Sequence, residues 1–373
     1  MNLARSKGTK NTLNSLTPTR KRRGRTKNTE PVSLQGNILG SPPLLIDGFS
    51  LQGRRPYQED RVKMIIDLAG SCPGSIDSVR ALQSSIGQWS RLSMFCVCDG
   101  HAGARAAEFV IANLSTTFWN VCVQVLQRKE KQKEANSDVP SDEEEDAVVV
   151  ETKFAEMKMR EDDNRDELIK DMLKATLLTL DKNWLERVKN SRVNDGCCVV
   201  VTLLIDDRWY FAHLGDCRAI LVRGNVAKDI TKDHTPGVDK NETLRIQKAG
   251  GRLEKRPGGV QRVCAGGTKI AVTRAIGDAN MKRLRNEADT PVLSSEADTK
   301  VVSSETFGDD FTLVLVSDGV TSRMSNKNIA NCLRLACQEE HRSNLSQYLV
   351  ERAYQRGSFD NISALIIRPN KKK

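Results

Sequence analysis

Four aspartates of this 373-residue chain share one sequence context, since each lies at the end of a short apolar run and three have Gly or Asn as the next residue. An acid at the end of a buried strand lies at the rim of a sheet, so we expect the four side chains to gather at one rim. Glycine there lets the backbone turn at once and approach a ligand closely. The four are Asp60 before the run at 62–66, Asp99 after 94–98, Asp318 after 311–316 and Asp360 before 362–367.

Clustered carboxylates repel one another unless a cation neutralises them, and Mg²⁺ and Mn²⁺ prefer oxygen ligands. The pattern therefore predicts a metal-dependent hydrolase. A single Asp-Gly pair is more often a simple turn, and it is the fourfold coincidence that favours a site. A zinc site is not expected, because the chain has only four His and no pair of CxxC motifs.

Apolar periodicity predicts the elements that position these acids. We expect strands at 62–66, 95–98, 311–317 and 362–367, a hairpin of 199–205 with 209–214 and a strand at 217–222 that continues the same meander. Helices are expected after Asp99, where apolar residues recur from Val110 to Val125, and at 244–249, 326–339 and 344–355. Antiparallel meanders with intervening helices favour an α+β fold whose sheets are covered by helices.

The net charge of +10 is unevenly distributed, because residues 1–29 hold nine Lys or Arg and no acid. Residues 1–40 are therefore expected to form a basic, disordered tail. The segment at about 128–171, which includes SDEEED at 141–146, is expected to be a solvated acidic insertion in the form of a charged loop. The longest apolar runs are much shorter than the roughly 20 residues of a membrane span, so no transmembrane segment is expected. The ten Cys are expected to be reduced and mostly buried.

Eight short motifs, spread over residues 47–368, together resemble the type 2C family of metal-dependent protein Ser/Thr phosphatases (the PPM family). Each motif alone is weak, but the ordered set is specific. They are RPYQED at 55–60, VCDGHAG at 97–103, LGDCR at 214–218, TKDHTP at 231–236, RI at 245–246 with AGG at 249–251, VTRAIGD at 272–278, VSDG at 316–319 and GSFDN at 357–361.

The resemblance implies a catalytic domain over residues 41–370, folded as a four-layer α-β-β-α sandwich of two antiparallel β-sheets flanked by helices. It also implies two Mg²⁺ or Mn²⁺ ions per active site and a weaker third ion. By resemblance, the ligands are Asp99 between the two ions, Asp318 and Asp360 on one ion, Glu59 and the Gly100 carbonyl on the other, Asp60 through water, and Asp216 on the third ion.

The same resemblance implies hydrolysis of phosphoserine and phosphothreonine by a water or hydroxide that bridges the two metals. Arg55 matches the phosphate-binding arginine of the family, and its planar guanidinium suits the phosphoryl oxygens. His101 matches the proposed general acid that protonates the leaving oxygen. For His101 the alternative is a structural hydrogen bond at the start of a helix. Asp278 and the Asp233-His234 pair are expected to hold loops.

Departures from the family pattern bear on substrate choice. Residues 320–322 are Val-Thr-Ser where the family often has an aromatic-acid pair, residues 283–293 near the expected substrate flap are polar and charged, and the acidic insertion has no counterpart. The expected partners are phosphoprotein substrates. A catalytically silent phosphatase-like scaffold is the alternative function, although no metal-binding acid of the pattern is missing.

The basic tail allows several interpretations. RKRRGR at 20–25 resembles a nuclear-localisation patch, which predicts contacts with import machinery or phosphate-bearing surfaces and a location in the nucleus or cytoplasm. Nucleic-acid binding is less favoured, because residues 1–29 contain no aromatic residue to stack on bases. A mitochondrial presequence ranks below both, since the tail lacks a clear apolar face. The sequence does not indicate an oligomeric state.

Overall fold

Strand β4 (Leu92–His101) illustrates how the chain forms layers, because its side chains alternate between two cores. Met94 and Cys96 pack against helices on one face, and Phe95 and Val97 pack against a second sheet on the other face. This period of two is what a strand buried on both faces produces. The protein is represented by a computed structural model, which describes residues 30–39, 42–71, 76–136, 150–255, 259–284, 290–338 and 344–370.

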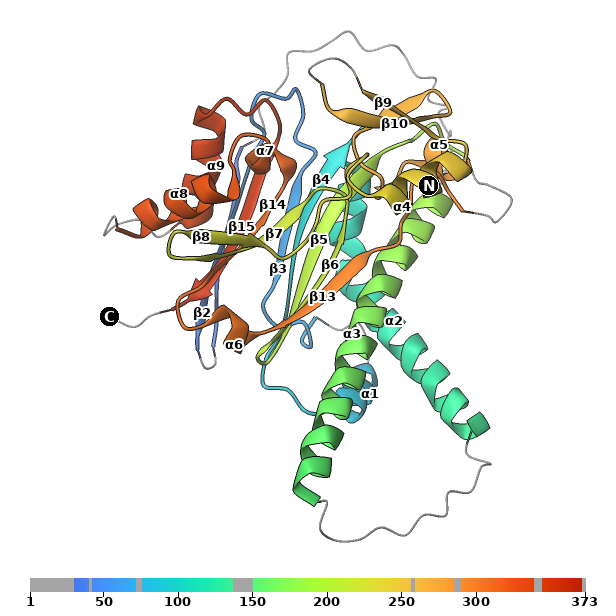
Figure 1. Cartoon of the computed structure of the whole chain (residues 1–373), viewed down its shortest axis with the longest axis vertical. Coiled ribbons are helices and arrows are strands. Elements are labelled where there is room, and N and C mark those ends of the chain that lie inside the picture. The colour runs from blue at the N-terminus through green and yellow to red at the C-terminus, as the bar shows by residue number, and fades with distance from the viewer. Residues whose placement is uncertain are drawn as a thin grey trace, which may run out of the picture.

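Two antiparallel sheets pack face to face (Figure 1). The first contains β1 (Val32–Ile38), β2 (Leu44–Leu51), β15 (Ile362–Pro369), β14 (Thr312–Val316), β7 (Arg218–Arg223) and β8 (Val226–Asp229), in that spatial order. The second contains β13 (Asp298–Ser303), β6 (Arg208–Leu214), β5 (Gly196–Ile205), β4 and β3 (Arg61–Ile65), and β12 (Ile276–Gly277) pairs with β5.

Helices cover the outer face of each sheet, which confirms the predicted four-layer α-β-β-α sandwich. The second sheet packs against α1 (Ile76–Ile86), α2 (Arg105–Asn136) and α3 (Val150–Val188), and the first packs against α8 (Asn326–Gln338) and α9 (Leu345–Gln355). In Figure 1, α2 and α3 extend well beyond the sheets.

Smaller elements lie around one end of the sandwich, at the top of Figure 1. A three-stranded sheet stands there beside two short helices, and α7 lies across from it over the first sheet. A further short helix, α6, precedes β14. The bounds are β9 (Arg252–Lys255), β10 (Gln261–Ala265), β11 (Thr268–Ile270), α4 (Lys240–Lys248), α5 (Ala279–Lys282), α6 (Ser304–Phe307) and α7 (Asp318–Thr321).

One stretch of α2, Arg105–Lys129, is long and apolar enough to cross a membrane by length and composition alone. Half of its most apolar window is buried in the fold. Val110, Leu114 and Phe118 of this stretch belong to the core beneath the second sheet. A core helix therefore accounts for the apolar run.

The prediction of a tail over residues 1–40 is wrong at its end, because β1 occupies Val32–Ile38. This strand pairs with β2 from Val32 opposite Ser50 to Ile38 opposite Leu44. Its first residues are exposed and only Ile38 is buried, as in an edge strand, and this weak alternation explains why composition alone missed it. Residues 1–29, with their basic cluster, lie outside the described residues.

Two further expectations need correction. The strand at 217–222 exists as β7, but it does not continue the β5–β6 meander, because it pairs with β14 in the other sheet. The segment at 128–171 is helical wherever it is described rather than a loop, and Leu168 and Ile169 are buried in the core. The acidic run at 141–146 lies outside the described residues.

Candidate active site

The predicted acids lie at the end of the sandwich that is uppermost in Figure 1, where strands of both sheets end. Asp99 lies near the end of β4, and Asp318 begins α7 directly after β14. The backbone N–H of Asp318 is 3.4 Å from Asp99 Oδ2, so the two sheets meet at these carboxylates. Asp60 precedes β3 and Asp360 precedes β15 at the same end.

Asp60 is almost fully buried, and only one of its oxygens has a protein partner. Its Oδ2 accepts hydrogen bonds from Ser317 Oγ at 2.8 Å and Ser363 Oγ at 2.7 Å. Its Oδ1 is buried and has no hydrogen-bond partner. Burial raises the pKa of Asp60 to about 7, although the two hydroxyls act to lower it. A buried carboxylate oxygen without a donor requires a cation or water to satisfy it.

Asp99 and Asp318 experience the combined negative charge of the site. Burial raises the pKa of Asp99 well above its ordinary value, and the charges of Asp60, Asp318, Asp216 and Asp360 add to this increase. Burial raises the pKa of Asp318 to about 8, with further contributions from Asp216 and Asp360. Carboxylates perturbed in this way indicate a place where a cation would be strongly stabilised. The donor set, all oxygen, fits Mg²⁺ or Mn²⁺.

Asp216 joins the site from the loop between β6 and β7. Burial raises its pKa, a hydrogen bond with Cys198 acts to lower it, and the charge of Asp233 raises it further. Since its charge acts on both Asp99 and Asp318, Asp216 lies within electrostatic range of both. This location is compatible with the predicted weaker third ion.

Glu59 and Gly100 approach each other across the ends of β3 and β4. A Cβ atom on Gly100 would lie 2.4 Å from the carbonyl oxygen of Glu59, so only glycine allows this approach. Burial raises the pKa of Glu59, while the nearby Arg55 and His101 act to lower it. The backbone segments that carry these two predicted ligands are thus adjacent.

Arg55 lies at the exposed mouth of the site. Its Nη2 is 2.6 Å from Asp360 Oδ2. Burial acts to lower the pKa of Arg55, but the charges of Asp360, Asp318 and Glu59 outweigh this effect and raise it. The structure therefore places the predicted phosphate-binding arginine against one of the predicted metal ligands.

His101 is held by Asp278, a contact that the sequence did not predict. His101 Nε2 is 2.8 Å from Asp278 Oδ2, and the Asp278 side chain is almost fully buried. Burial acts to lower the pKa of His101, but the Asp278 charge and hydrogen bond outweigh it and raise the pKa. Gly196 makes room for the pair, because a Cβ there would lie 2.1 Å from Asp278 Oδ2. The proton-bearing ring is thus fixed at the edge of the acidic cluster.

Asn361 connects the two loops that carry Arg55, Glu59 and Asp360, and sequence reasoning assigned it no role. Its Nδ2 donates to the carbonyl oxygens of Gln52 at 2.7 Å and Tyr57 at 2.8 Å. Its Oδ1 accepts from the backbone N–H of Glu59 at 2.8 Å. The Asn of the GSFDN motif was the available signal, because an Asn side chain carries both a donor and an acceptor that can satisfy loop backbone.

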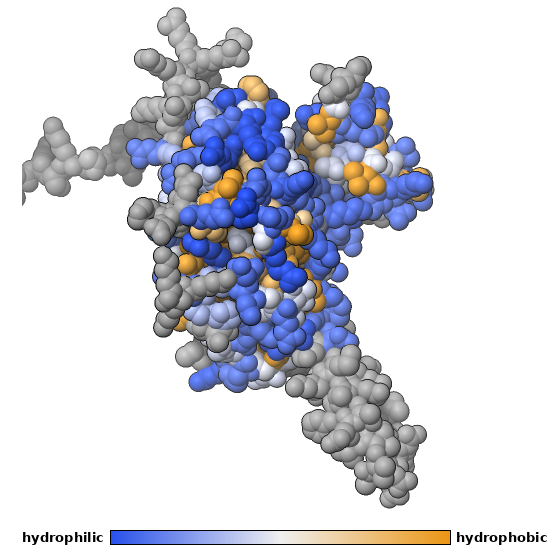
Figure 2. All heavy atoms as spheres, turned by 60° about the vertical axis from the view of Figure 1, so that its left-hand side comes forward, coloured by the Kyte–Doolittle hydropathy of each residue, from blue (hydrophilic) through white to orange (hydrophobic). Residues whose placement is uncertain are grey.

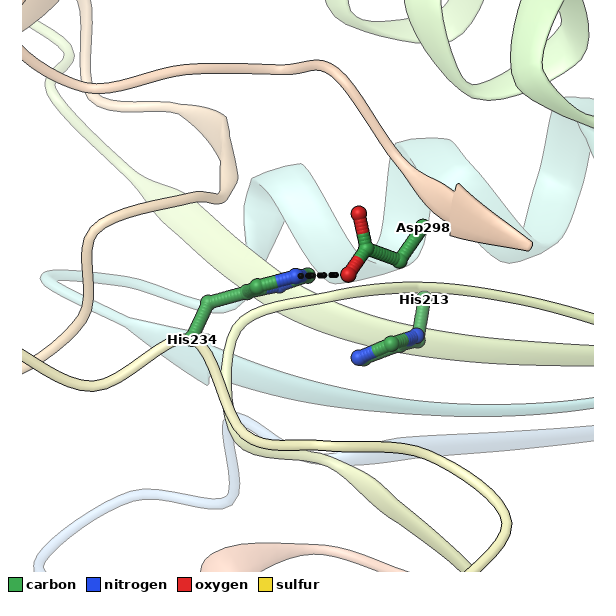
Figure 3. A group of neighbouring side chains, drawn as sticks. All are labelled: His213, His234 and Asp298. Atoms are coloured by element: carbon green, nitrogen blue, oxygen red, sulfur yellow. Dashed lines mark ion pairs between the residues drawn. The ribbon is translucent and has the colours of Figure 1, made fainter. Parts of the chain in front are cut away.

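A separate cluster of His213, His234 and Asp298 has ligand-type atoms that all lie within 4.8 Å of one another (Figure 3). The hydrogen bonds argue against a metal there. The N–H of Gly215 donates to His234 Nδ1 at 3.1 Å, so the ring proton must be on Nε2, 3.2 Å from Asp298 Oδ2. A cation on Nε2 would leave the ring with no proton. Asp298 is already paired with the cation of Arg274, at 2.9 Å.

The cluster instead anchors loops, as predicted for His234. The rings of His213 and His234 stack with centroids 4.5 Å apart, and His213 Nε2 donates to the Lys232 carbonyl at 2.8 Å. Asp233 pairs with Arg218 at 2.6 Å. These contacts hold residues 231–234 against β6, β7 and β13.

Comparison with known proteins finds a matching family and several relatives. The family model "Protein phosphatase 2C" matches residues 74–362. The chain is 28% identical over 328 residues to probable protein phosphatase 2C 25 of Arabidopsis thaliana, covering 86% of this chain and 64% of that protein. It is 26% identical over 325 residues to protein phosphatase 1L of Bos taurus, covering 86% of this chain and 71% of that protein. Among the first curated relatives, the chain spans between 48% and 67% of their length.

Solved structures show the same fold. Serine-threonine phosphatase 2C from Toxoplasma gondii superposes with a TM-score of 0.66 at 21% identity, covering 91% of this chain and 98% of that one. A sex determining protein of C. elegans superposes with a TM-score of 0.60 at 24% identity, covering 87% of this chain and 65% of that one. With the family match extending over most of its length, this chain belongs to the protein phosphatase 2C family.

Proposed function

We propose that the protein is a metal-dependent protein Ser/Thr phosphatase that hydrolyses phosphoserine and phosphothreonine by direct attack of water. The observation that supports this most strongly is the buried Asp60 Oδ1 without a partner, in a group of carboxylates whose pKa values are raised. Such a group is stable at neutral pH when cations occupy it.

Asp99, Asp318 and Asp360 are the proposed direct ligands, with Glu59 and the Gly100 carbonyl on a second ion. Asp60 would act through water, and Asp216 would hold a weaker third ion. When bound, two divalent cations supply an activated water and offset the charge on the phosphoryl oxygens.

Arg55 would bind the phosphoryl oxygens with its planar pair of donors. It can do so from its present place, since the mouth of the site is exposed and its contact with Asp360 lies there. His101, oriented by Asp278, would donate its proton to the leaving serine or threonine oxygen. Arg55 would thus act on the phosphoryl side of the P–O bond that breaks, and His101 on its leaving oxygen.

The decisive experiment measures phosphate release from a phosphoserine peptide with Mn²⁺ and with EDTA. Wild-type protein should release phosphate only with Mn²⁺. Asp318→Asn should abolish release, whereas Asp309→Asn, in the exposed turn before β14, should not. Circular dichroism and thermal unfolding of both variants check the fold. If wild-type protein releases no phosphate under any metal condition, the scaffold alternative is favoured instead.

The family match also supports phosphoproteins as the partners of the site. We further propose that the basic tail directs the protein to the nucleus, with the cytoplasm as the alternative. Replacing the four Arg and the Lys of residues 20–25 by Ala in a fluorescent fusion should shift it from nucleus to cytoplasm. An unchanged distribution would contradict a targeting role.

A further inference from the structure

Two arginines and two aromatic rings form an exposed rim beside the candidate site, here called the arginine rim: Arg54, Arg323, Tyr354 and Phe359. Arg54 Cζ lies 5.0 Å from the centroids of both the Tyr354 and Phe359 rings. Arg323 Cζ lies 5.9 Å from the Phe359 centroid. One exposed ring therefore has two cations beside it.

The arginine rim is adjacent in sequence to residues of the candidate site. Arg54 precedes Arg55, and Phe359 precedes Asp360, so the rim flanks the 2.6 Å ion pair between Arg55 and Asp360. Arg323 follows α7, which begins at Asp318. Phe359 is 64% exposed, and Tyr57 on the adjoining loop is 69% exposed. The rim therefore lies beside the place where a phosphate bound at Arg55 would be.

The charge of the rim is not compensated by the described part of the chain. Within that part, neither Arg54 nor Arg323 has a carboxylate at ion-pair distance, and both contact the aromatic rings instead. Stacking on a ring orients a guanidinium and leaves its in-plane N–H groups able to donate. Two neighbouring cations with free donors favour an anionic ligand, and the carboxylate is the anion that a peptide supplies.

The hydrophilic character of the surrounding face favours a charged ligand over an apolar one. The face that carries α8 and α9 is largely hydrophilic in Figure 2, with only small, separated apolar areas. An apolar peptide helix would require a continuous apolar groove. The exposed Phe359 is better explained as the platform on which the arginines are held.

We propose that the arginine rim binds carboxylate side chains that flank the phosphorylated residue, so that the enzyme prefers phosphopeptides with Asp or Glu next to the phosphoserine. The inference rests on the proposed function, because it assumes that the phosphate lies at Arg55. One residue of extended peptide spans about 3.3 Å, so acids one or two positions away are the ones in reach.

The test compares two phosphoserine peptides that differ only in having Glu or Ala at the flanking positions. With Mn²⁺, wild-type kcat/KM should be about threefold to tenfold higher for the acidic peptide, the size expected of exposed charge pairs. Arg54→Ala and Arg323→Ala should each reduce this ratio towards one, and Arg54→Lys should retain part of it. Arg187→Ala is the matched control, since Arg187 stacks on Phe109 between α2 and α3 on the other side of the sandwich.

A binding measurement separates this inference from the proposed function. In EDTA, where turnover stops, fluorescence anisotropy of the labelled acidic peptide should show weaker binding to Arg54→Ala than to wild type, even if the protein proves to have no phosphatase activity. A wild-type ratio near one, or a ratio unchanged in both arginine variants, would overturn the inference while leaving the phosphatase assignment intact. It would also be overturned if Arg54→Ala weakened binding of a single-stranded RNA oligonucleotide but not of the peptide.

Discussion

His101 Nε2 lies 2.8 Å from Asp278 Oδ2, and the two residues are 177 positions apart in the chain. Asp278 has a left-handed backbone conformation with φ of 57° at the start of α5. The carboxylate is therefore fixed by the fold rather than by its neighbours in sequence. We infer that Asp278 positions His101 and helps to keep it protonated for donation.

Asp278→Asn should lower kcat with a phosphoserine peptide by about tenfold to a hundredfold, because general-acid catalysis is worth that much or more. The loss should be smaller with p-nitrophenyl phosphate, whose leaving group needs no proton. Steady-state kinetics on both substrates measures the difference. Equal losses would indicate a purely structural role, and Asp309→Asn provides the control for loss of an acid.

Arg55→Ala should raise KM for the phosphopeptide by about tenfold or more, since a charge-assisted bidentate contact contributes roughly 1.5 to 3 kcal/mol. Arg55→Lys should recover only part of this, because an ammonium cannot form the planar pair of donors. Michaelis-Menten kinetics checks both, with Arg187→Ala as the control. Wild-type values of both kcat and KM in Arg55→Ala would contradict phosphate binding.

The contribution of His213 to the free energy of unfolding should decrease as pH falls below about 6.5. Burial lowers the pKa of His213 to about 4, and the neighbouring His234 adds to the effect. Between the unfolded value near 6.5 and this folded value, the unfolded chain binds the proton first, so acid destabilises the fold. Below pH 4 both states are protonated and the contribution stops changing.

The size of this contribution is at most about 3 kcal/mol, since one pKa unit corresponds to about 1.4 kcal/mol. Urea unfolding at pH 7 and pH 4.5 measures it in wild type and in His213→Gln, whose amide can still donate to the Lys232 carbonyl. On acidification the free energy of unfolding of wild type should fall relative to that of the variant. An identical pH dependence in both proteins would exclude His213 as the cause.

Gly319→Ala should destabilise the protein by about 3 kcal/mol or more and abolish activity, as expected of severe overcrowding. A Cβ at this position would lie 1.9 Å from the Asn361 carbonyl oxygen, which cannot move without displacing the Asp360 loop. Gly224→Ala is the control, because its φ of 56° carries a backbone cost but nothing lies within 4 Å of an added Cβ. Chemical unfolding should show a smaller loss there, with activity retained.

The sequence was most informative where a feature is local. Apolar runs identify buried strands, so the strands before Asp318 and after Asp360 were predicted within two residues of their observed bounds. The strand before Asp99 was also identified, but β4 extends three residues beyond the predicted run at each end. The family motifs then assigned the acids to one site. Their gathering at one end of the sandwich follows from the sheet order, which no single run contains.

Long-range pairing accounts for most of what was missed. Strand β7 follows β6 closely in sequence but pairs with β14, and a local pattern cannot reveal that the chain crosses to the other sheet. The contact of His101 with Asp278 is a similar case. The ion pair of Arg55 with Asp360 was missed for a different reason, because it depends on side-chain geometry at the surface.

Strand β15 lies in the middle of the first sheet, between β2 and β14, although it is the last element that the structure describes. Asp360 and Asn361 enter the site on the loop that leads into it. During synthesis on the ribosome, the site residues that come early in the chain therefore cannot form a complete site until nearly the whole domain has been translated. A nascent chain that ends before residue 357 would have a split first sheet and an incomplete set of acids, so premature truncation should yield protein that neither folds nor hydrolyses phosphate.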